Sequence, residues 1–233
     1  MTSSRRSRSA SEVPSPSLLF ELPFGALLAY SPRGTSELSK QSRGLCYQIK
    51  LDGVIGDPPV RAIERAVARL SDEGSSALRE FIAQGEILVP CPPNAPFPPK
   101  QKPALWVPRR ICEVLGNAGY GSAILPCLER VEAVPKSAFA APGERPSPSR
   151  HMKSMRVTKT LEAPERITLV DDVVTKGATL LAAASLLADA YPDAEIRAFA
   201  LVRTTGLTPN VERIIDPVVG KIRRTPSGAD RDP

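Results

Sequence analysis

Residues 167–180 read ITLVDDVVTKGATL, and this stretch decides the fold that the chain is expected to adopt. It opens with apolar residues that suit a buried strand, and two adjacent carboxylates, Asp171 and Asp172, follow. A short polar segment then leads to Ala178, where a run rich in alanine and leucine predicts a helix. The order of strand, acidic turn, polar loop and helix is typical of the units that build parallel α/β sheets.

The segment between the acids and the helix has the features of an anion-binding loop. Its main-chain N–H groups and the helix N-terminus converge on one point, where a phosphate group would lie. Gly177 permits a positive φ, Thr175 and Thr179 add hydroxyl donors, and Lys176 adds a charge. The two acids suit a diol, or a metal ion held through water. The pattern therefore predicts a ribose 5-phosphate site, and an ordinary strand–helix turn with a chance acidic pair is the alternative.

Residues 170–180, VDDVVTKGATL, resemble the phosphoribosyl pyrophosphate (PRPP) loop of type I phosphoribosyltransferases, in which two acids precede a Thr-Thr-Gly-x-Thr loop. The match departs at Lys176, where the family usually has threonine. The resemblance implies that Asp171 and Asp172 are the catalytic acids and hold the ribose hydroxyls and metal-bound waters. It implies Mg²⁺ bound through PRPP and water, without direct protein ligands. The residues that it assigns to PRPP binding, besides the two acids, are Val173, Val174, Thr175, Lys176, Gly177, Ala178 and Thr179.

Strand and helix patterns alternate along the rest of the chain. Because such alternation is typical of parallel sheets with crossover helices, we expect an α/β fold with a doubly wound, mainly parallel sheet of the Rossmann-like, type I phosphoribosyltransferase kind. One domain is expected over 18–220, between disordered tails at 1–17 and 221–233. Strands are predicted over 24–30, 45–51, 86–90, 167–171 and 196–204, and helices over 59–70, 76–84, 104–117 and from 178 onward.

Shorter stretches resemble ComF-type phosphoribosyltransferase-like proteins. They are YSPRGTSELSKQSRGLCYQIKLDG at 30–53, LVPCPPN at 88–94 and LVRT at 201–204. The paired-cysteine zinc module that often opens that family is not present in the sequence. The ComF-like resemblance implies an alternative to an enzyme: a non-catalytic PRPP or nucleotide sensor, or a partner in DNA uptake or processing.

The proline-rich loop after the strand at 86–90 is a candidate for contacting pyrophosphate. In type I enzymes the loop after an early strand does so, and by position this implies Cys91, Pro92 and Asn94. The main-chain N–H groups of Cys91 or Asn94 would be the donors. A turn that merely ends the strand is the alternative.

The long basic segment at 130–159 corresponds in position to the mobile loop of type I enzymes. Such a loop closes over the active site and would supply cations to the leaving pyrophosphate, here from Arg150, Lys153 and Arg156. Disorder without a role is the alternative, because long loops are usually either functional or disordered. His151 is expected to be a solvated loop histidine.

Composition sets limits on the class of protein. The 233 residues are 42% apolar but only 5% aromatic, which suits one α/β domain with an aliphatic core. Four dispersed cysteines and one histidine argue against a zinc site and favour buried free thiols in a reducing compartment. The net charge of +6 fits an anionic substrate. Contact of the basic tails with nucleic acid is the weaker alternative to solvated tails. The sequence shows no secretory signal and no segment long enough to cross a bilayer, so we expect a cytoplasmic protein without membrane contact.

These observations predict a Mg²⁺-dependent phosphoribosyltransferase. The resemblance implies transfer of the ribose 5-phosphate group of PRPP to a nitrogen nucleophile, with release of pyrophosphate. Type I relatives are commonly dimers, so it also implies a homodimer. The acceptor would be recognised by residues between 18 and 53 and by the chain after Thr204, where no known base-binding pattern occurs.

Overall fold

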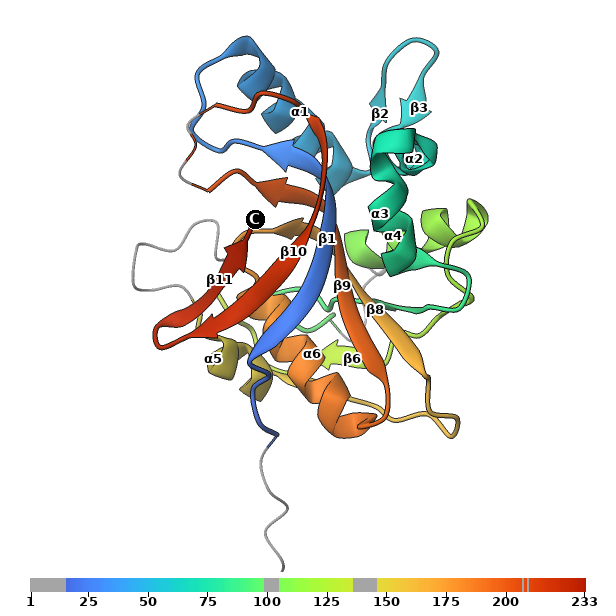
Figure 1. Ribbon diagram of the computed structural model, residues 1–233, viewed down its shortest axis with the longest axis vertical. Coiled ribbons are helices and arrows are strands. Elements are labelled where there is room, and N and C mark those ends of the chain that lie inside the picture. The colour runs from blue at the N-terminus through green and yellow to red at the C-terminus, as the bar shows by residue number, and fades with distance from the viewer. Residues whose placement is uncertain (1–15, 99–104, 136–145, 207, 209) are drawn as a thin grey trace, which may run out of the picture.

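A seven-stranded sheet forms the centre of the computed structural model, which describes residues 16–98, 105–135, 146–206, 208 and 210–233 (Figure 1). Across the sheet the strands are β11 (Gly228–Asp232), β10 (Ile215–Thr225), β1 (Glu21–Tyr30), β9 (Glu195–Thr204), β8 (Arg166–Val174), β4 (Ile87–Pro90) and β5 (Ala123–Ile124). The last five of these run parallel to one another, and β10 pairs antiparallel with both β1 and β11. The α/β class and the mostly parallel sheet are therefore confirmed.

Two small antiparallel pairs and six α-helices complete the regular structure of the described residues. The pairs are β2 (Val54–Ile55) with β3 (Val60–Arg61), and β6 (Leu128–Arg130) with β7 (Met155–Val157). The α-helices are α1 (Glu37–Leu51), α2 (Ala62–Ala68), α3 (Ser76–Arg79), α4 (Val107–Asn117), α5 (Pro148–Lys153) and α6 (Ala178–Ala190). Single 3₁₀ turns lie at Arg69–Ser71, Glu73–Ser75 and Glu80–Ile82.

The sheet separates two hydrophobic cores. Helices α1 to α4 pack on one face, where Ile49, Ile63 and Leu115 are fully buried. Helix α6 packs on the other face with Leu181 and Leu187 at its centre (Figure 1). Both cores consist mainly of aliphatic side chains, as expected from the low aromatic content.

Strand β8 and helix α6 form as the stretch 167–180 predicts. Ile167, Leu169 and Val170 are fully buried because β8 lies between β4 and β9. The strand continues through the acid pair, since Asp171 still pairs with Ala200 of β9. It therefore ends at Val174, three residues later than expected from the sequence.

The expected strand at 45–51 is wrong, because these residues form the second half of α1. The buried positions Ser39, Ser42, Cys46 and Ile49 recur at intervals of three or four residues, as on one face of a helix. Ser36 caps the first turn, and Asp52 ends the helix in the left-handed conformation.

The expected disordered tail at 221–233 is also wrong. These residues complete β10 and form β11, and β10 pairs with β1 so that Arg223 lies opposite Glu21. Ile222 is fully buried while its neighbours in the strand are charged, which is the alternation of a half-buried strand. Most of the expected N-terminal tail at 1–17 lies outside the described residues. Among the helices of the described segments, none combines the length and apolar character needed to span a membrane.

Candidate functional site

The acid pair lies where β8 approaches the carboxyl edge, which is the edge at which the parallel strands end. Asp171 and Asp172 are both half-buried. The N–H of Asp172 donates to Oδ1 of Asp171 at 2.9 Å, and the N–H of Val173 donates to Oδ1 of Asp172 at 2.8 Å. These contacts turn both carboxylates toward the main chain and leave one oxygen of each for other partners.

Burial and two neighbouring charges determine the electrostatics of the acid pair. Burial, reinforced by the adjacent carboxylate of Asp172, raises the pKa of Asp171 well above its ordinary value. Nζ of Lys50, in the last turn of α1, lies 3.8 Å from Oδ2 of Asp172.

A small cavity of about 30 Å³ lies between Asp171 and the start of α6, and Asp172 is not among its lining residues. It is large enough for a group a little bigger than a water molecule. Gly177 precedes α6 with φ of +84°, so the first N–H groups of the helix lie at the cavity. The predicted residues that line the cavity are Asp171, Val173, Val174, Thr175, Gly177, Ala178 and Thr179, together with Leu180.

Lys176 is the member of the predicted loop that does not line this cavity. Its side chain is exposed, and Nζ lies 3.9 Å from Oδ1 of Asp230 on β11. The threonine that the family usually has at this position would have no ammonium for such a pair. The charge of Lys176 is thus directed toward the hairpin.

The C-terminal hairpin, defined as β10 and β11, supports the loop from outside. Nε of Arg231 donates to the carbonyl oxygen of Thr175 at 3.0 Å. A side chain at position 177 would place its Cβ 2.7 Å from atoms of Ile222. The hairpin therefore restricts the loop at both Thr175 and Gly177.

His151 lies behind the loop and is buried, so the expected solvated histidine is wrong. Its Nε2 is 3.4 Å from Oγ1 of Thr179, and Nδ1 has no hydrogen-bond partner among the described residues. Burial, with the nearby charges of Arg130 and Arg150, lowers the pKa of His151 to about 4. The imidazole is therefore neutral at physiological pH.

Arg130 joins this region to the loop after β4. Nε donates to the carbonyl oxygen of Pro93 at 2.9 Å, and Nη1 donates to Oγ of Ser154 at 2.6 Å. Nη2 is buried without a partner among the described residues. Burial lowers the pKa of Arg130, and the charge of Asp171 acts in the opposite direction. A buried guanidinium thus lies within electrostatic reach of the acid pair.

The N–H of Cys91, which was expected together with that of Asn94 as a possible donor to pyrophosphate, is already bonded within the protein. That N–H donates to the carbonyl oxygen of Val170 at 2.8 Å and extends the pairing of β4 with β8. The carbonyl oxygen of Cys91 accepts a hydrogen bond from Nε1 of Trp106 at 2.7 Å. Pro92 carries no N–H, and the carbonyl oxygen of Asn94 accepts a bond from Val134.

A second, larger pocket of about 250 Å³ opens beside this loop. The rings of Phe97 and Trp106 stand 5.5 Å apart at 60° and form part of its wall. Its other lining residues are Pro92, Pro93, Ala95, Pro96, Pro126, Leu128, Glu129 and Arg130. The pocket is thus mainly apolar and aromatic, with one acid and one guanidinium.

The described parts of the expected mobile loop are packed against the protein. Arg150 and Lys153 are exposed on α5, which lies against α6, and Arg156 of β7 donates to Glu129 at 2.7 Å. The middle of the segment, 136–145, lies outside the described residues.

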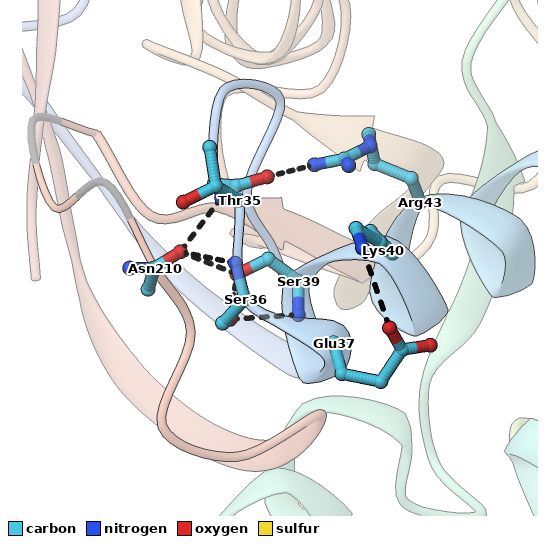
Figure 2. Close-up of polar contacts among 8 residues, drawn as sticks. Thr35, Ser36, Glu37, Ser39, Lys40, Arg43 and Asn210 are labelled. Carbon is cyan, nitrogen blue, oxygen red and sulfur yellow. Dashed lines mark hydrogen bonds and ion pairs between the residues drawn. The ribbon is translucent and has the colours of Figure 1, made fainter.

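The loop after β1 also reaches the carboxyl edge, and a residue far along the chain holds it there. Oδ1 of Asn210 accepts hydrogen bonds from the N–H groups of Thr35 and Ser36 at 2.9 and 3.0 Å, as Figure 2 shows. Arg43 approaches the same loop from α1 and donates to the carbonyl oxygen of Gly34 (Figure 2). The two regions expected to recognise the acceptor, at 18–53 and after Thr204, are therefore in contact.

Metal binding by protein side chains alone is not indicated. Within the described residues, no three histidine, cysteine or acidic side chains are grouped as a metal site. Two adjacent carboxylates suit Mg²⁺ that arrives with the oxygens of a ligand and keeps its own water. The four cysteines are buried and free, as expected, and burial raises the pKa of each thiol.

Three residues near the site were not identified from the sequence as parts of it. Lys50 stood in a segment interpreted as a strand, Arg231 in a segment interpreted as disordered, and Arg130 at the start of the basic segment at 130–159. No local pattern marks them, because their partners lie far away in the chain. Neither a scan against models of known protein families nor a search of curated proteins finds a match to the chain.

Proposed function

We propose that the protein is a phosphoribosyltransferase, which binds PRPP with Mg²⁺ and transfers its ribose 5-phosphate group to a nitrogen nucleophile. The observation that carries the proposal is the cavity that Asp171, the loop after β8 and the start of α6 enclose together. It combines main-chain donors for a phosphate group with the carboxylate of Asp171 for a diol, at the edge of the sheet where ligands of such folds bind.

Each group of residues would have a role that follows from its chemistry. The N–H groups from Thr175 to Thr179 would bind the 5-phosphate, and Asp171 and Asp172 would accept hydrogen bonds from the ribose hydroxyls. Mg²⁺ bound to PRPP would stabilise the charge that develops on the departing pyrophosphate. The carboxylates would lie near the ribose ring and favour positive charge on it. Lys50 would balance the charge of Asp172 in the free protein.

Isothermal titration of PRPP into the purified chain, with and without Mg²⁺, tests the proposal. We expect Mg²⁺-dependent binding that the double variant Asp171→Asn/Asp172→Asn loses. Since burial raises the pKa of Asp171, binding that requires its charge should weaken as the pH falls. Titrations at several pH values measure this change. Equal binding by the double variant would exclude the assignment of the site.

The phosphate side of the site has its own test. The hydroxyl of Thr179 would contact a charged group, and such hydrogen bonds contribute about 1.5–3 kcal/mol. Replacing Thr179 by valine, which keeps the shape, should weaken binding of ribose 5-phosphate about tenfold or more. Unchanged affinity would exclude Thr179 from the site.

A second candidate function is binding of PRPP without turnover. The observation that favours it is the loop after β4, where the N–H of Cys91 is already bonded and Pro92 and Pro93 have none. A leaving pyrophosphate would find few main-chain donors there. Measuring pyrophosphate release with a panel of bases and amines separates the two: release supports the transferase, and tight PRPP binding without release supports the sensor.

A further inference from the structure

The guanidinium of Arg231 connects the ends of two neighbouring strands at the candidate phosphate site. Nε donates to the carbonyl oxygen of Thr175 at 3.0 Å, just after β8, and Nη2 donates to the carbonyl oxygen of Thr204 at the end of β9. The group also lies over the ring of Phe24, with 5.5 Å between Cζ and the ring centroid. Burial and the neighbouring charge of Arg203 lower the pKa of Arg231 to about 10, so it stays charged at neutral pH.

The bond to Thr175 fixes the direction of one peptide unit in the loop. A carbonyl oxygen and the following N–H point in opposite directions across a trans peptide. Because the oxygen of Thr175 is turned toward Arg231, the N–H of Lys176 is turned away from the hairpin. Thr175 itself lines the cavity, where a free carbonyl oxygen would repel an anion.

We propose that Arg231 is a positioning residue for the 5-phosphate: it holds the carbonyl oxygen of Thr175 away from the phosphate and so aligns the N–H groups of the loop toward it. This inference rests on the proposed function. It makes β11, a strand outside the predicted domain, part of the phosphate subsite. The ligand that it concerns is the monoester phosphate of a ribose 5-phosphate group, and the pyrophosphate end of PRPP is not involved.

The neighbouring contacts support this role. Ile222 of β10 occupies the space next to Gly177, and Asp230 of β11 lies 3.9 Å from the ammonium of Lys176. The hairpin thus contacts three successive residues of the loop. Preorganised donors lose less free energy on binding than donors that must first be ordered. We therefore expect the loss of Arg231 to weaken phosphate binding without changing any residue that touches the ligand.

The test compares two ligands and three variants of the full chain by isothermal titration. Arg231→Met removes the donors and the charge but keeps an apolar stem, and Arg231→Lys keeps the charge but cannot contact both carbonyl oxygens. Arg224→Met is the matched control, because Arg224 is exposed on β10 of the same hairpin. The ligands are ribose 5-phosphate and pyrophosphate with Mg²⁺, and circular dichroism checks that each variant is folded.

We expect Arg231→Met to weaken ribose 5-phosphate binding about tenfold and Arg231→Lys about threefold, while pyrophosphate binding changes less than about twofold. Arg224→Met should bind both ligands as the unmodified chain does. If the unmodified chain binds ribose 5-phosphate and both Arg231 variants bind it equally well, the positioning role is excluded and the proposed function stands. If Arg231→Met does not fold, wild-type affinity in Arg231→Lys alone excludes the role. If the unmodified chain binds neither ligand, the proposed function fails, and this inference fails with it.

Discussion

Strands β8 and β4 are neighbours in the sheet, yet their carboxyl ends differ in kind. At the end of β8 the main chain leaves polar groups free around a small cavity, beside two half-buried carboxylates. At the end of β4 the N–H and the carbonyl oxygen of Cys91 are both bonded within the protein, and prolines and aromatic rings follow. Position at the carboxyl edge therefore does not by itself make a binding loop. The N–H of Cys91 is already bonded and Pro92 and Pro93 have none, whereas the loop after β8 leads into a helix whose first N–H groups have no intrahelical partner.

The glycine after β8 can be compared with one that follows α4. Gly177 and Gly119 share a φ of +84°, but a Cβ at 177 would lie 2.7 Å from Ile222, whereas a Cβ at 119 meets nothing within 4 Å. Left-handed strain costs about 1–3 kcal/mol and overpacking a similar amount. Gly177→Ala should therefore lower the free energy of unfolding by about 4 kcal/mol, and Gly119→Ala by about 2. Chemical denaturation measures both, and equal losses would mean that Ile222 moves aside.

His151 connects the two strand ends through Thr179 and Arg130. Its pKa is about 4 when folded and about 6.5 when unfolded, so the unfolded chain binds the proton first as the pH falls. The contribution of the neutral His151 to the free energy of unfolding is therefore fully present above pH 6.5, and about 3 kcal/mol of it is lost as the pH falls to 4. His151→Gln should remove most of this acid sensitivity, and Lys153→Gln, exposed on the same helix, should not. Urea denaturation at pH 7 and pH 4.5 measures the difference, and the same acid sensitivity in both variants would exclude His151 as its source.

Lys50 tests the charge balance at the end of β8. Its ammonium lies 3.8 Å from Asp172 and holds down the pKa of Asp171. Lys50→Met should raise that pKa further, weaken Mg²⁺-dependent PRPP binding about fivefold and shift its pH dependence upward. Thermal stability should change little, because the pair is partly exposed. Lys40→Met on the same helix, where Lys40 pairs with Glu37, is the control. A weakening that does not vary with pH would argue against this mechanism.

Trp106 gives the smallest expected effect, at the end of β4. Trp106→Phe removes the donor to Cys91 but keeps a ring, so the free energy of unfolding should fall by about 1 kcal/mol. PRPP affinity should stay unchanged, as titration can show. A loss of affinity would reveal that the end of β4 takes part in binding and would remove the contrast between the two strands.

The regions predicted well are those whose signal is local. The apolar run at 167–170 and the alanine and leucine run after Gly177 predict β8 and α6 without reference to the rest of the chain. The prediction of a strand at 45–51 failed because the spacing of its apolar residues fits both a strand and a helix. Only packing on the sheet selects the helix. The strand at 221–225 was not predicted because Ile222, its one buried side chain, stands among charged residues.

The site was predictable to the same extent. The acid pair and the loop follow one another in sequence, and Asp171 and most of the loop line one cavity. Lys50 approaches Asp172, and Arg231 approaches Thr175, only through tertiary structure, because each lies far from its partner in the chain. Cys91 looked available because the sequence does not show that its N–H continues the pairing of β4 with β8.

The pairing of β1 has a consequence for how the chain acquires its structure. Phe24 lies beside Ala198 on one side and Gly220 on the other, so the first strand of the sheet has partners 174 and 196 residues away. Contacts so distant in sequence make folding slow, and on a ribosome β1 must wait for almost the whole described chain. During that time its apolar face, with Leu22, Phe24 and Ala26, is unpaired and prone to aggregation. Expression at low temperature or with chaperones should therefore raise the yield of folded protein.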